Sequence, residues 1–418
     1  MRSTQALLPG ATFEPSQLPA PLQALGAYQA AVGLGPVGIE SVPLAAAFGR
    51  ILAADAVAHE EFPAQSRSTM DGFAVRSADG AQPRRIVGEV RMGLAPPSAV
   101  GEGEAIRIPT GGTLPGGADA VVPIEDADAA GEVMQVRAAP EAGQYFTPAG
   151  SDMTAGQVAI GAGSRIGGPE LGVLATLGEI LVPVFRRPRF AIISTGDELV
   201  DAALVPGIGQ VRDSNRWAIA GTLAALGADV LHLPKARDDV DALRVALAAG
   251  LARADAVILS GGSSVGERDL TPDAIATFPG PGVIVHGMRV KPGKPTVLAA
   301  VGIKPVIGLP GNPVSALTIL EAVCAPLVRA MTGERAARAA VVATVAGAPF
   351  SGRAGWTTYA PAELRRDAAG ERAFPLALRS AHTSLLARAS GYVVLTEERW
   401  EIAVGEALDL VRFSGGAR

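Results

Sequence analysis

The spacing of apolar and polar residues changes several times along the chain and predicts a series of structural regions. Residues 22–32 and 44–54 both have a helical, alanine-rich spacing. Between Glu60 and Gly150, short apolar runs are divided by Gly and Pro clusters, a pattern typical of a small β-rich domain. A helical spacing returns at residues 169–177. We therefore predict that the β-rich domain is inserted between two parts of one helical domain.

From Arg187 the chain alternates between short apolar strands and longer amphipathic helices. The predicted strands are 190–193, 230–233 and 255–259, and the predicted helices are 214–226 and 239–252. This alternation implies a three-layer α/β/α domain with a mostly parallel sheet and helices on both faces. After Gly333 a period-two alternation predicts a small β-barrel or sandwich over residues 334–418. The fold class is therefore multidomain, with α/β and β parts.

Composition narrows the class of protein. A chain of 418 residues is too long for one compact core and suggests about three domains. With 48% hydrophobic and 18% charged residues, it has the composition of a soluble, well-cored protein. Its formal net charge is −5, whereas nucleic-acid-binding proteins present basic patches to phosphates. The charge argues against a nucleic-acid partner, and any anionic ligand must be held by a local cluster of basic groups.

The few cysteines and histidines exclude several kinds of site. Cys324, the single cysteine, rules out an intramolecular disulfide and fits a reducing compartment. It lies in an apolar helical stretch, so we expect a buried core residue. The four histidines have no ligand-like spacing, so no zinc site is expected. Residues 1–20 have the composition of a flexible lead-in, and we expect no bilayer-spanning segment of ~20 apolar residues. A cytoplasmic protein without a membrane partner is the prediction.

Three Gly- or Pro-rich loops carry the strongest indication of a binding site. They are Ser260–Asp269, Arg289–Pro295 and Leu309–Ser315, and the first and third follow directly after apolar strands. In an open α/β sheet, ligands bind outside the carboxyl ends of the strands, where the backbone N–H groups of such loops converge. Glycines let the main chain approach a phosphate or a flat ring closely. Together with the nearby lysines, the loops predict a site for a bulky anionic small molecule.

Basic residues gather in the second of these loops. Arg289 and Lys291 should point to the same side of an extended segment, because side chains alternate along it. Pro292-Gly293 suits a type II turn that would bring Lys294 back toward them. A convergence of three cations needs an anion to offset it, whereas the alternative is a solvated basic turn.

Eight segments that follow one another along the chain carry a resemblance. They are Ser68–Arg76, Ile108–Gly111, Gly150–Asp152, Ser194–Leu199, Asp213–Arg216, Ser260–Asp269, Lys291–Pro295 and Pro310–Ser315. In sequence and in order they resemble the molybdopterin molybdenumtransferase family, which includes MoeA and the E domains of gephyrin and its plant counterpart. One Gly-rich loop alone would be a weak signal, but eight ordered motifs are specific.

The resemblance implies a division into domains. A flexible lead-in (1–20) is followed by a split N-terminal linker domain (21–59 and 151–186), with a β-rich domain (60–150) inserted into it. A molybdopterin-binding α/β domain similar to MogA (187–333) and a C-terminal β-barrel domain (334–418) complete the chain.

The resemblance also implies an activity in molybdenum cofactor biosynthesis. Such a transferase binds adenylylated molybdopterin and molybdate, hydrolyses the adenylate, and releases AMP and the molybdenum cofactor. Two alternatives stay open. A molybdopterin adenylyltransferase, whose fold residues 187–330 resemble, would not require domains like 60–150 and 334–418. A gephyrin-like scaffold without catalysis would not need a set of carboxylates and lysines.

Partners are implied in the same way. The family is dimeric, so we expect a homodimer, and adenylylated molybdopterin and molybdate as ligands. The adenylyltransferase of the preceding step and the chaperones of molybdoenzymes are further expected partners.

Four residues are carried over from the family as catalytic, namely Asp71, Thr110, Glu198 and Asp269. Glu198 and Asp269 offer the oxygen ligands that Mg²⁺ prefers, so Mg²⁺ is the expected cofactor, with molybdate as co-substrate. Structural alternatives exist for three of them. Asp71 precedes a glycine as in an Asx turn, Thr110 suits a turn hydroxyl, and Asp269 suits a helix cap.

A larger set is carried over as substrate-binding. Its members are Gly261, Gly262, Ser263, Ser264, Gly266, Arg268, Lys291, Lys294, Pro310, Gly311, Asn312, Pro313, Ser315, Asp152, Asp238 and Ser384. Asp238 has a helix N-cap as its alternative, and Ser384 matches the family only loosely. The chain departs from some relatives at Gly287, where they have a lysine, so one anion contact is either missing or replaced by Arg289.

Overall fold

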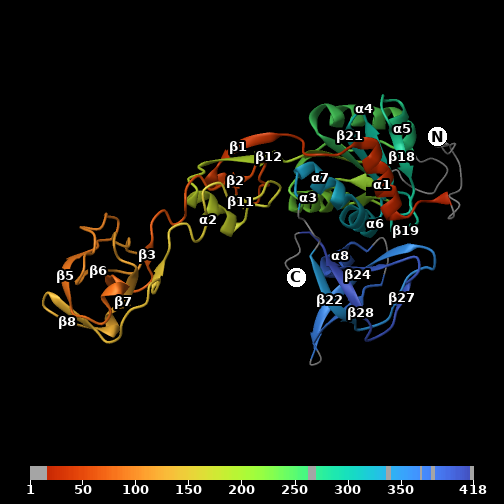
Figure 1. Ribbon diagram of the computed structural model, residues 1–418. Coiled ribbons are helices and arrows are strands. Elements are labelled where there is room, and N and C mark those ends of the chain that lie inside the picture. Colours follow the sequence, from red (N-terminus) through yellow and green to blue (C-terminus); the bar gives the residue numbers. More distant parts are fainter. Residues whose placement is uncertain (1–16, 262–269, 336–339, 368–369, 378–381, 415–418) are drawn as a thin grey trace. The chain divides into compact units, whose positions relative to one another are not determined.

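The computed structural model describes residues 17–261, 270–335, 340–367, 370–377 and 382–414 (Figure 1). The chain divides into two compact units. The larger unit comprises Met1–Ala53, Gly163–Gly167 and Leu181–Arg418, and the smaller unit comprises Ala54–Ala162 and Gly168–Ile180.

The smaller unit is built around a six-stranded sheet in the order β7-β4-β6-β5-β9-β8. Its strands are β4 (Gly72–Val75), β5 (Arg84–Glu89), β6 (Glu104–Ile108), β7 (Ala120–Pro123), β8 (Ala127–Ala130) and β9 (Val133–Val136). Alternate residues of β4 supply two different cores, because successive side chains point to opposite faces. Phe73 and Val75 pack in one apolar cluster, and Ala74 packs in another with Ile106.

The remaining elements of the smaller unit are short. They are β2 (Ala56–Val57), β3 (Arg67–Ser68), β10 (Phe146–Thr147), β11 (Val158–Ile160) and helix α2 (Gly168–Thr176). Strand β10 pairs with β3, and β11 pairs with β2, so segments about 80 to 100 residues apart run side by side. Helix α2 agrees with the helix predicted at 169–177.

The larger unit contains a second six-stranded sheet, in the order β16-β13-β17-β21-β20-β18. Its strands are β13 (Arg189–Ser194), β16 (Asp229–His232), β17 (Ala256–Ser260), β18 (Gly282–His286), β20 (Val297–Val301) and β21 (Lys304–Leu309). The first four strands in this order are parallel, and β20 and β18 are antiparallel. The mostly parallel sheet predicted from the sequence is therefore confirmed.

Helices cover both faces of this sheet, and the alternation of residues along β13 shows why (Figure 1). Phe190 and Ile192 pack with residues of α1 (Pro21–Val32), α3 (Asn215–Ala225) and α6 (Pro313–Ile319). Ala191 and Ile193, on the opposite face, pack with residues of α4 (Val240–Arg253) and α5 (Leu270–Ala276). The predicted helices 22–32, 214–226 and 239–252 correspond to α1, α3 and α4.

One continuous helix was not anticipated in its full length. Helix α6, the π-helical turn Leu320–Cys324 and α7 (Ala325–Thr332) together span Pro313–Thr332. Their length and composition would allow the helix to cross a membrane, so the prediction that no such run exists was wrong. However, 72% of its most apolar window is buried inside the protein, as in the core helix of a soluble fold. Cys324 is fully buried there, as predicted.

The C-terminal part of the larger unit is a small closed barrel. It is formed by β22 (Val341–Ala346), β24 (Thr357–Asp367), β25 (Gly370–Pro375), β26 (Gly391–Leu395) and β28 (Ala407–Arg412), and β24 pairs with both β25 and β26 to close the ring. The two-residue strand β19 (Val290–Lys291) pairs with β24. Shorter elements are β23 (Phe350–Ser351), β27 (Glu401–Ile402) and helix α8 (Thr383–Arg388). The barrel thus confirms the β-barrel prediction.

The helix predicted at 44–54 is absent from the structure. Strand β1 (Ile39–Pro43), which pairs with β12 (Leu181–Phe185), leads only into a single 3₁₀ turn at Leu44–Ala46. The backbone N–H groups of Gly49 and Leu52 donate to carbonyls of Ile166 and Ser164, not to the preceding turn. Pairing with a distant segment overrides the local helical spacing here, because the backbone donors are already satisfied.

Candidate active site

A cleft of about 1030 Å³ opens at the carboxyl ends of the parallel strands of the larger unit. Three loops line it: those that follow β13, β17 and β21. The first residues of α3 and α6 and one residue of α8 also reach it. Its size is at the upper end of the range for small-molecule sites, and its position is the usual one for ligands of open α/β sheets.

The loops after β17 and β21 are in direct backbone contact. Gly261 has φ +105°, and a Cβ at this position would lie 2.1 Å from the carbonyl oxygen of Thr195. A Cβ on Gly311 would lie 3.6 Å from the Cα of Gly261. The Gly261 N–H also donates to the carbonyl of Leu309 at 3.3 Å. Only glycine fits at position 261, where the chain is both in a positive-φ conformation and against another backbone.

The loop after β13 presents Glu198 to the cleft. A Cβ on Gly196 would lie 2.7 Å from both carboxylate oxygens of Glu198, so the absence of a side chain there makes room for the carboxylate. Asp238, predicted as a binding residue with a helix cap as the alternative, lines the cleft and also holds this loop. Its Oδ1 accepts from Thr195 Oγ1 at 2.5 Å, and its Oδ2 accepts from the Asp197 N–H at 3.3 Å. The N-cap of α4 is Asp239, whose side chain accepts from Ala242 N.

The start of α3 supplies a residue that was not assigned from the sequence. Asn215 lines the cleft and is 8% exposed. Its Nδ2 donates to Ser260 Oγ at 3.0 Å and to the Gly311 carbonyl at 2.8 Å. Asp213 caps the helix by accepting from the Arg216 N–H, whereas Ser214 makes no side-chain cap bond. The sequence signal that could have identified Asn215 is a polar residue at the first position of a helix that follows a β-strand.

The Pro-rich loop after β21 lies in the cleft as predicted from its sequence. Pro310, Gly311, Asn312, Pro313 and Ser315 all line it. Ser315 is 5% exposed, because α6 begins at Pro313 and turns this side chain inward. Gly261 from the β17 loop and Asp238 complete the group that the sequence assigned to substrate binding and the structure brings together.

The basic loop differs from its prediction. The guanidinium of Arg289 pairs with both carboxylate oxygens of Glu397 at 2.8–3.2 Å, a partner that the sequence did not predict. Lys291 is exposed, and Lys294 is partly buried. Neither is among the residues that line the cleft, although the adjacent Pro295 is. Arg289 therefore has a structural role in tying this loop to the barrel.

Two glycines shape this basic loop. Gly293 has φ +106°, consistent with the predicted turn, and a Cβ there would lie 2.1 Å from Ile319 Cγ1, so the turn packs directly on α6. Gly287 has φ +81°, a conformation that a lysine would adopt only with strain. The departure from the family at 287 thus has a backbone reason in this chain.

The smaller unit holds three of the predicted site residues. Asp71 and Thr110 are neighbours, since Asp71 Oδ1 accepts from the Thr110 N–H at 2.7 Å. Both are exposed, at the ends of the adjacent strands β4 and β6. Asp152 is also exposed, and its backbone N–H donates to the carbonyl of Phe62. The Asx-turn alternative for Asp71 is replaced by this longer-range contact.

Several predicted residues fall elsewhere. Ser384 is exposed and does not line the cleft, whereas Thr383 beside it does. The assigned residues Gly262, Ser263, Ser264, Gly266, Arg268 and Asp269 lie outside the described residues. Among the residues that the structure describes, no three His, Cys, Asp or Glu side chains form a metal-binding group.

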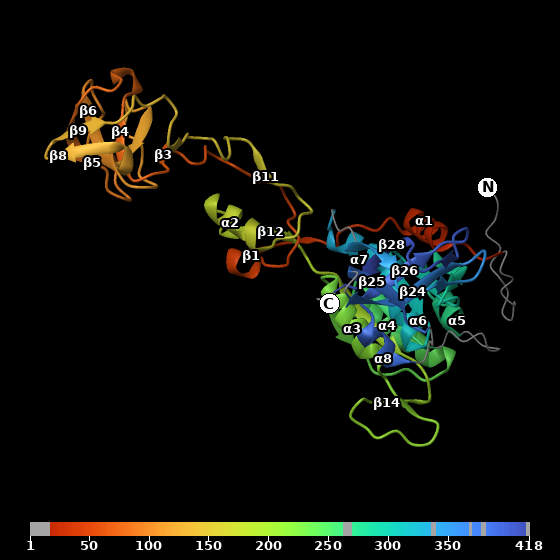
Figure 2. The ribbon, with the colours of Figure 1, turned by 90° about the horizontal axis from the view of Figure 1, so that it is seen from below.

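Two short strands that contribute residues to the cleft, β14 (Leu199–Val200) and β15 (Val211–Arg212), are joined by an apolar loop. Figure 2 shows this loop extending away from the α/β body. Leu204, Val205 and Ile208 in it are 56% exposed or more. This loop therefore presents exposed apolar side chains close in sequence to residues that line the cleft.

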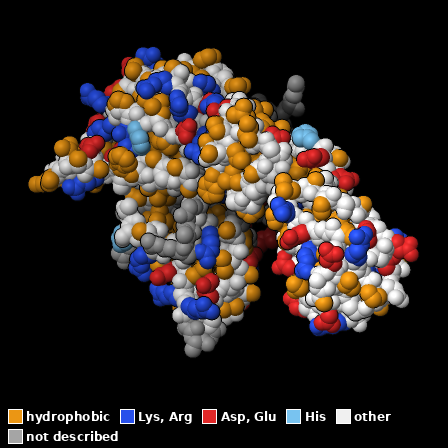
Figure 3. Space-filling model, turned by 90° about the vertical axis from the view of Figure 1, so that its left-hand side faces the viewer, with side chains coloured by type: hydrophobic (Ala, Val, Ile, Leu, Met, Phe, Trp, Pro, Cys, Tyr) orange, Lys and Arg blue, Asp and Glu red, His pale blue; other side chains and the backbone are white. Residues whose placement is uncertain are grey.

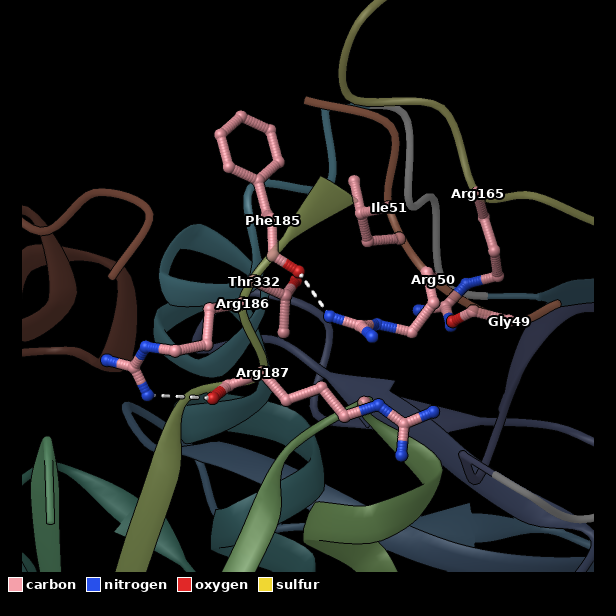
Figure 4. Close-up of a pocket in the computed structure, with 9 residues that line it drawn as sticks. Gly49, Arg50, Ile51, Arg165, Phe185, Arg186, Arg187 and Thr332 are labelled. Atoms are coloured by element: carbon pink, nitrogen blue, oxygen red, sulfur yellow. Dashed lines mark hydrogen bonds between the residues drawn. The ribbon is translucent and has the colours of Figure 1, made fainter. Parts of the chain in front are cut away.

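A second, much smaller cavity is lined by arginines (Figure 4). It measures about 10 Å³, room for one water at most. Arg50, Arg165 and Arg186 line it, and Arg187 lies beside them. Each pairs with an acid: Glu40, Glu334, Asp255 and Asp229, respectively. Hydrogen bonding to Asp255 raises the pKa of Arg186. These pairs tie together the segments of the larger unit and leave no space for an anion.

Charge is distributed unequally between the two units. The smaller unit has 17 Asp and Glu against 7 Arg, a formal charge of −10, and the larger unit has the remaining 24 acidic and 29 basic residues, a charge of +5. Figure 3 shows acidic side chains scattered over the face of the smaller unit. The unit that contains the cleft is thus the one suited to anionic ligands.

Comparison with protein families gives two matches. Residues 22–178 match the family described as the MoeA N-terminal region (domain I and II), and residues 191–330 match a probable molybdopterin-binding domain. The two matches cover the smaller unit and the α/β sheet with its cleft.

Individual proteins are similar over most of the chain. A molybdopterin molybdenumtransferase of Nostoc sp. is 35% identical over 70% of this chain and 70% of its own. A molybdopterin molybdenumtransferase 2 of Mycobacterium tuberculosis is 32% identical over 88% of this chain and 94% of its own. Two structures of a molybdopterin biosynthesis MoeA protein from Pyrococcus horikoshii have TM-scores of 0.81 and 0.84. They are 30% and 23% identical, cover 96% and 95% of this chain, and are themselves fully covered.

Proposed function

Since the chain belongs to the molybdopterin molybdenumtransferase family, we propose that it inserts molybdate into adenylylated molybdopterin, with hydrolysis of the adenylate and release of AMP and molybdenum cofactor. The chain is accordingly a transferase of molybdenum cofactor biosynthesis. The observation that carries the proposal is the cleft of about 1030 Å³ at the carboxyl end of the sheet, lined by the loops that contain the family motifs. A pterin linked to a nucleotide is larger than most metabolites and needs a cleft of this size.

The walls of the cleft suit the parts of this substrate. Gly261 and Gly311 bring two backbones together and can form a flat wall for a pterin ring. Asn312 and Ser315 add polar groups beside it. Lys291 and Lys294 on the adjacent loop supply positive charge for molybdate, a dianion.

A magnesium ion fits the donor set of the cleft. Mg²⁺ is usually held by one or two carboxylates together with substrate phosphates, so it does not need a preformed cluster of three acidic side chains. Glu198 presents its carboxylate at the cleft, and Asp269 is the second ligand carried over from the family. The bound ion would neutralise charge on the phosphoanhydride. Glu198 orients this end of the site, with the loop beneath it held by Asp238.

The residues of the smaller unit complete the proposal. Asp71 and Thr110 are carried over as catalytic, and neither belongs to the unit that contains the cleft. We propose a two-fold dimer in which the smaller unit of one chain supplies them to the cleft of the other. The opposite formal charges of the two units, −10 and +5, favour such an encounter. The proposal includes a cytoplasmic location, where the pathway's other enzymes would be its partners.

Molybdenum transfer is favoured over adenylyl transfer by the extent of the similarity. The Mycobacterium tuberculosis relative matches 88% of the chain, far more than the α/β domain alone. The organisation of the chain around a cleft lined by carboxylate and hydroxyl groups also favours an enzyme over a scaffold.

The direct test incubates the purified chain with adenylylated molybdopterin, with and without molybdate. We expect AMP release and molybdenum cofactor formation only when molybdate and Mg²⁺ are both present. Treatment with a chelator should abolish AMP release, and added Mg²⁺ should restore it. Full AMP release after exhaustive chelation would contradict the role of Mg²⁺. Failure to form cofactor under any of these conditions would contradict the proposed function.

A further inference from the structure

Asn215 joins two loops that lie far apart in the sequence. It is the first residue of α3, and it is 8% exposed. Its Nδ2 donates one hydrogen bond to Ser260 Oγ and another to the Gly311 carbonyl, at 3.0 and 2.8 Å. Ser260 ends β17, and Gly311 follows β21. One side-chain amide therefore links the starts of both glycine loops of the cleft.

The two N–H donors of the Asn215 side chain have these two acceptors as their partners. A carboxamide has two N–H donors, and both are used. A backbone carbonyl only accepts, so the Gly311 oxygen fixes the amide nitrogen on that side. Oδ1 is buried and accepts no hydrogen bond from the residues that the structure describes.

The two linked loops are already in contact, so a shift of one moves the other. Gly311 approaches Gly261, and Gly261 lies against the carbonyl of Thr195 with no space for a side chain. All three residues line the cleft, together with Asn215. The amide therefore lies where the loops that follow β13, β17 and β21 meet in the cleft.

We propose that Asn215 is a positioning residue that sets the spacing of the Gly261 and Gly311 loops, and thereby the width of the slot that takes the pterin ring. The inference rests on the proposed function, because the ring belongs to the substrate of that reaction. Asn215 does not touch the reacting atoms. It acts through the two backbones that it holds.

Two near-isosteric variants test this role. Asn215→Asp keeps the size and shape but places an oxygen against the Gly311 carbonyl, and Asn215→Leu keeps the approximate volume without any donor. We expect either change to raise the KM for adenylylated molybdopterin about tenfold or more, since both variants lose the hydrogen bond to the Gly311 carbonyl. The KM for molybdate should stay within about twofold, because no link to the lysine loop is broken. Thr222→Ala is the matched control, because Thr222 is partly buried and lies about two turns along the same helix. This variant should alter neither of the two KM values.

Hydrogen exchange provides a second readout that does not depend on activity. In both Asn215 variants, the amides of Gly261 and Gly311 should exchange faster than in the wild type, while those of α4 should be unchanged. An equal rise of both KM values, or faster exchange throughout the larger unit, would show that Asn215 supports the fold generally and would overturn the inference. A wild-type protein that does not convert adenylylated molybdopterin would overturn the proposed function. In that case unchanged exchange at Gly261 and Gly311 would still reject the link on its own.

Discussion

The cleft of the larger unit and the strand ends of the smaller unit present their polar groups in different ways. In the cleft, loops from β13, β17 and β21 converge on a concavity of about 1030 Å³, and Asn215 and Asp238 hold their backbones. In the smaller unit, Asp71 and Thr110 lie exposed at the ends of two strands and bond to each other. The cleft is preorganised for binding, whereas the strand ends present groups that need another surface to enclose them.

The two units also differ in formal charge. The formal charges of +5 and −10 suit the larger unit to an anionic ligand and the smaller unit to a basic surface. In the proposed function, binding and part of the catalysis are therefore assigned to different compact units. The following predictions test that division, beginning with the largest effect.

The largest effect is expected when the two regions are inactivated in separate chains. Asp71→Asn and Glu198→Gln should each lower kcat by about 100-fold or more, as loss of a catalytic carboxylate does. Random pairing on co-expression makes about half of the dimers mixed, each with one intact site, so activity should return to about a quarter of wild type. AMP release by the co-expressed protein is the measurement.

The control for this experiment is a demonstration that mixed dimers form, by two different affinity tags on the variants. Each variant alone must also be folded and inactive. Recovery no greater than the sum of the two separate variants would show that each site is built within one chain, and would remove the division between binding and catalysis.

The next effect concerns the contact of the two glycine loops in the cleft. Gly261→Ala places a Cβ 2.1 Å from the Thr195 carbonyl in a positive-φ conformation, so we expect a loss of about 2–4 kcal/mol in the free energy of unfolding. Gly311→Ala is the matched control, since its Cβ would make an ordinary 3.6 Å contact with Gly261. Its stability should equal or exceed that of the wild type by up to about 1 kcal/mol. Denaturant unfolding measures both, and equal losses would contradict the account of the junction.

The basic loop offers a test of the charge assigned to the larger unit. Lys291→Ala should weaken the apparent affinity for molybdate by roughly 10- to 100-fold, because a charge-assisted hydrogen bond contributes about 1.5–3 kcal/mol. Lys304→Ala removes the same charge from the start of β21, opposite the cleft, where Nζ donates to the carbonyls of Leu251 and Ala254. It should lower thermal stability without changing the molybdate affinity. Equal molybdate affinity in the wild type and Lys291→Ala would support the alternative that this loop is a solvated basic turn.

The smallest effect is expected from a comparison of one buried ionisable group in each unit, Glu321 in the larger and Arg84 in the smaller. Burial raises the pKa of Glu321 above its usual value, although the Ser414 N–H donates to its carboxylate. A raised pKa stabilises the fold at pH values below the ordinary glutamate pKa, and this contribution is lost as the pH rises through the pKa of the folded state. The difference in Tm between Glu321→Gln and the wild type should therefore shift in favour of the variant by about 1–3 °C as the pH is raised from 4 to 7.

Arg84 provides the opposite case and the control. Burial lowers the pKa of Arg84, which stays charged over this pH range and donates to the carbonyls of Gln82, Arg76 and Gly80. The Tm of Arg84→Met should therefore be lower than that of the wild type by an amount that does not vary with pH. Thermal unfolding at several pH values measures both variants, and a constant difference for Glu321→Gln would contradict the pKa argument.

The elements that the sequence predicted correctly are those in which local pattern and tertiary burial agree. Residues 190–193 are apolar without a break because β13 packs on both faces, and α1, α3 and α4 occupy the segments with helical spacing. The segment 44–54 failed because its backbone pairs with residues 164–183. The division of the chain into a lead-in and four domains remains a prediction, and the structure itself separates two compact units.

For the site, the residue types and the family motifs indicated which loops face the ligand, and Gly261, Glu198 and the segment from Pro310 to Ser315 do line the cleft. The sequence alone determined the class of fold, the family and these loops, because strand periodicity, glycine and proline placement are local properties. Only the tertiary structure decided three contacts. Arg289 forms an ion pair with Glu397, and Asp238 accepts hydrogen bonds from the β13 loop. Asn215 donates hydrogen bonds to the loops of β17 and β21. Each of those contacts joins residues between 41 and 108 positions apart, and a side chain's choice among distant partners is fixed by packing, which no local pattern records.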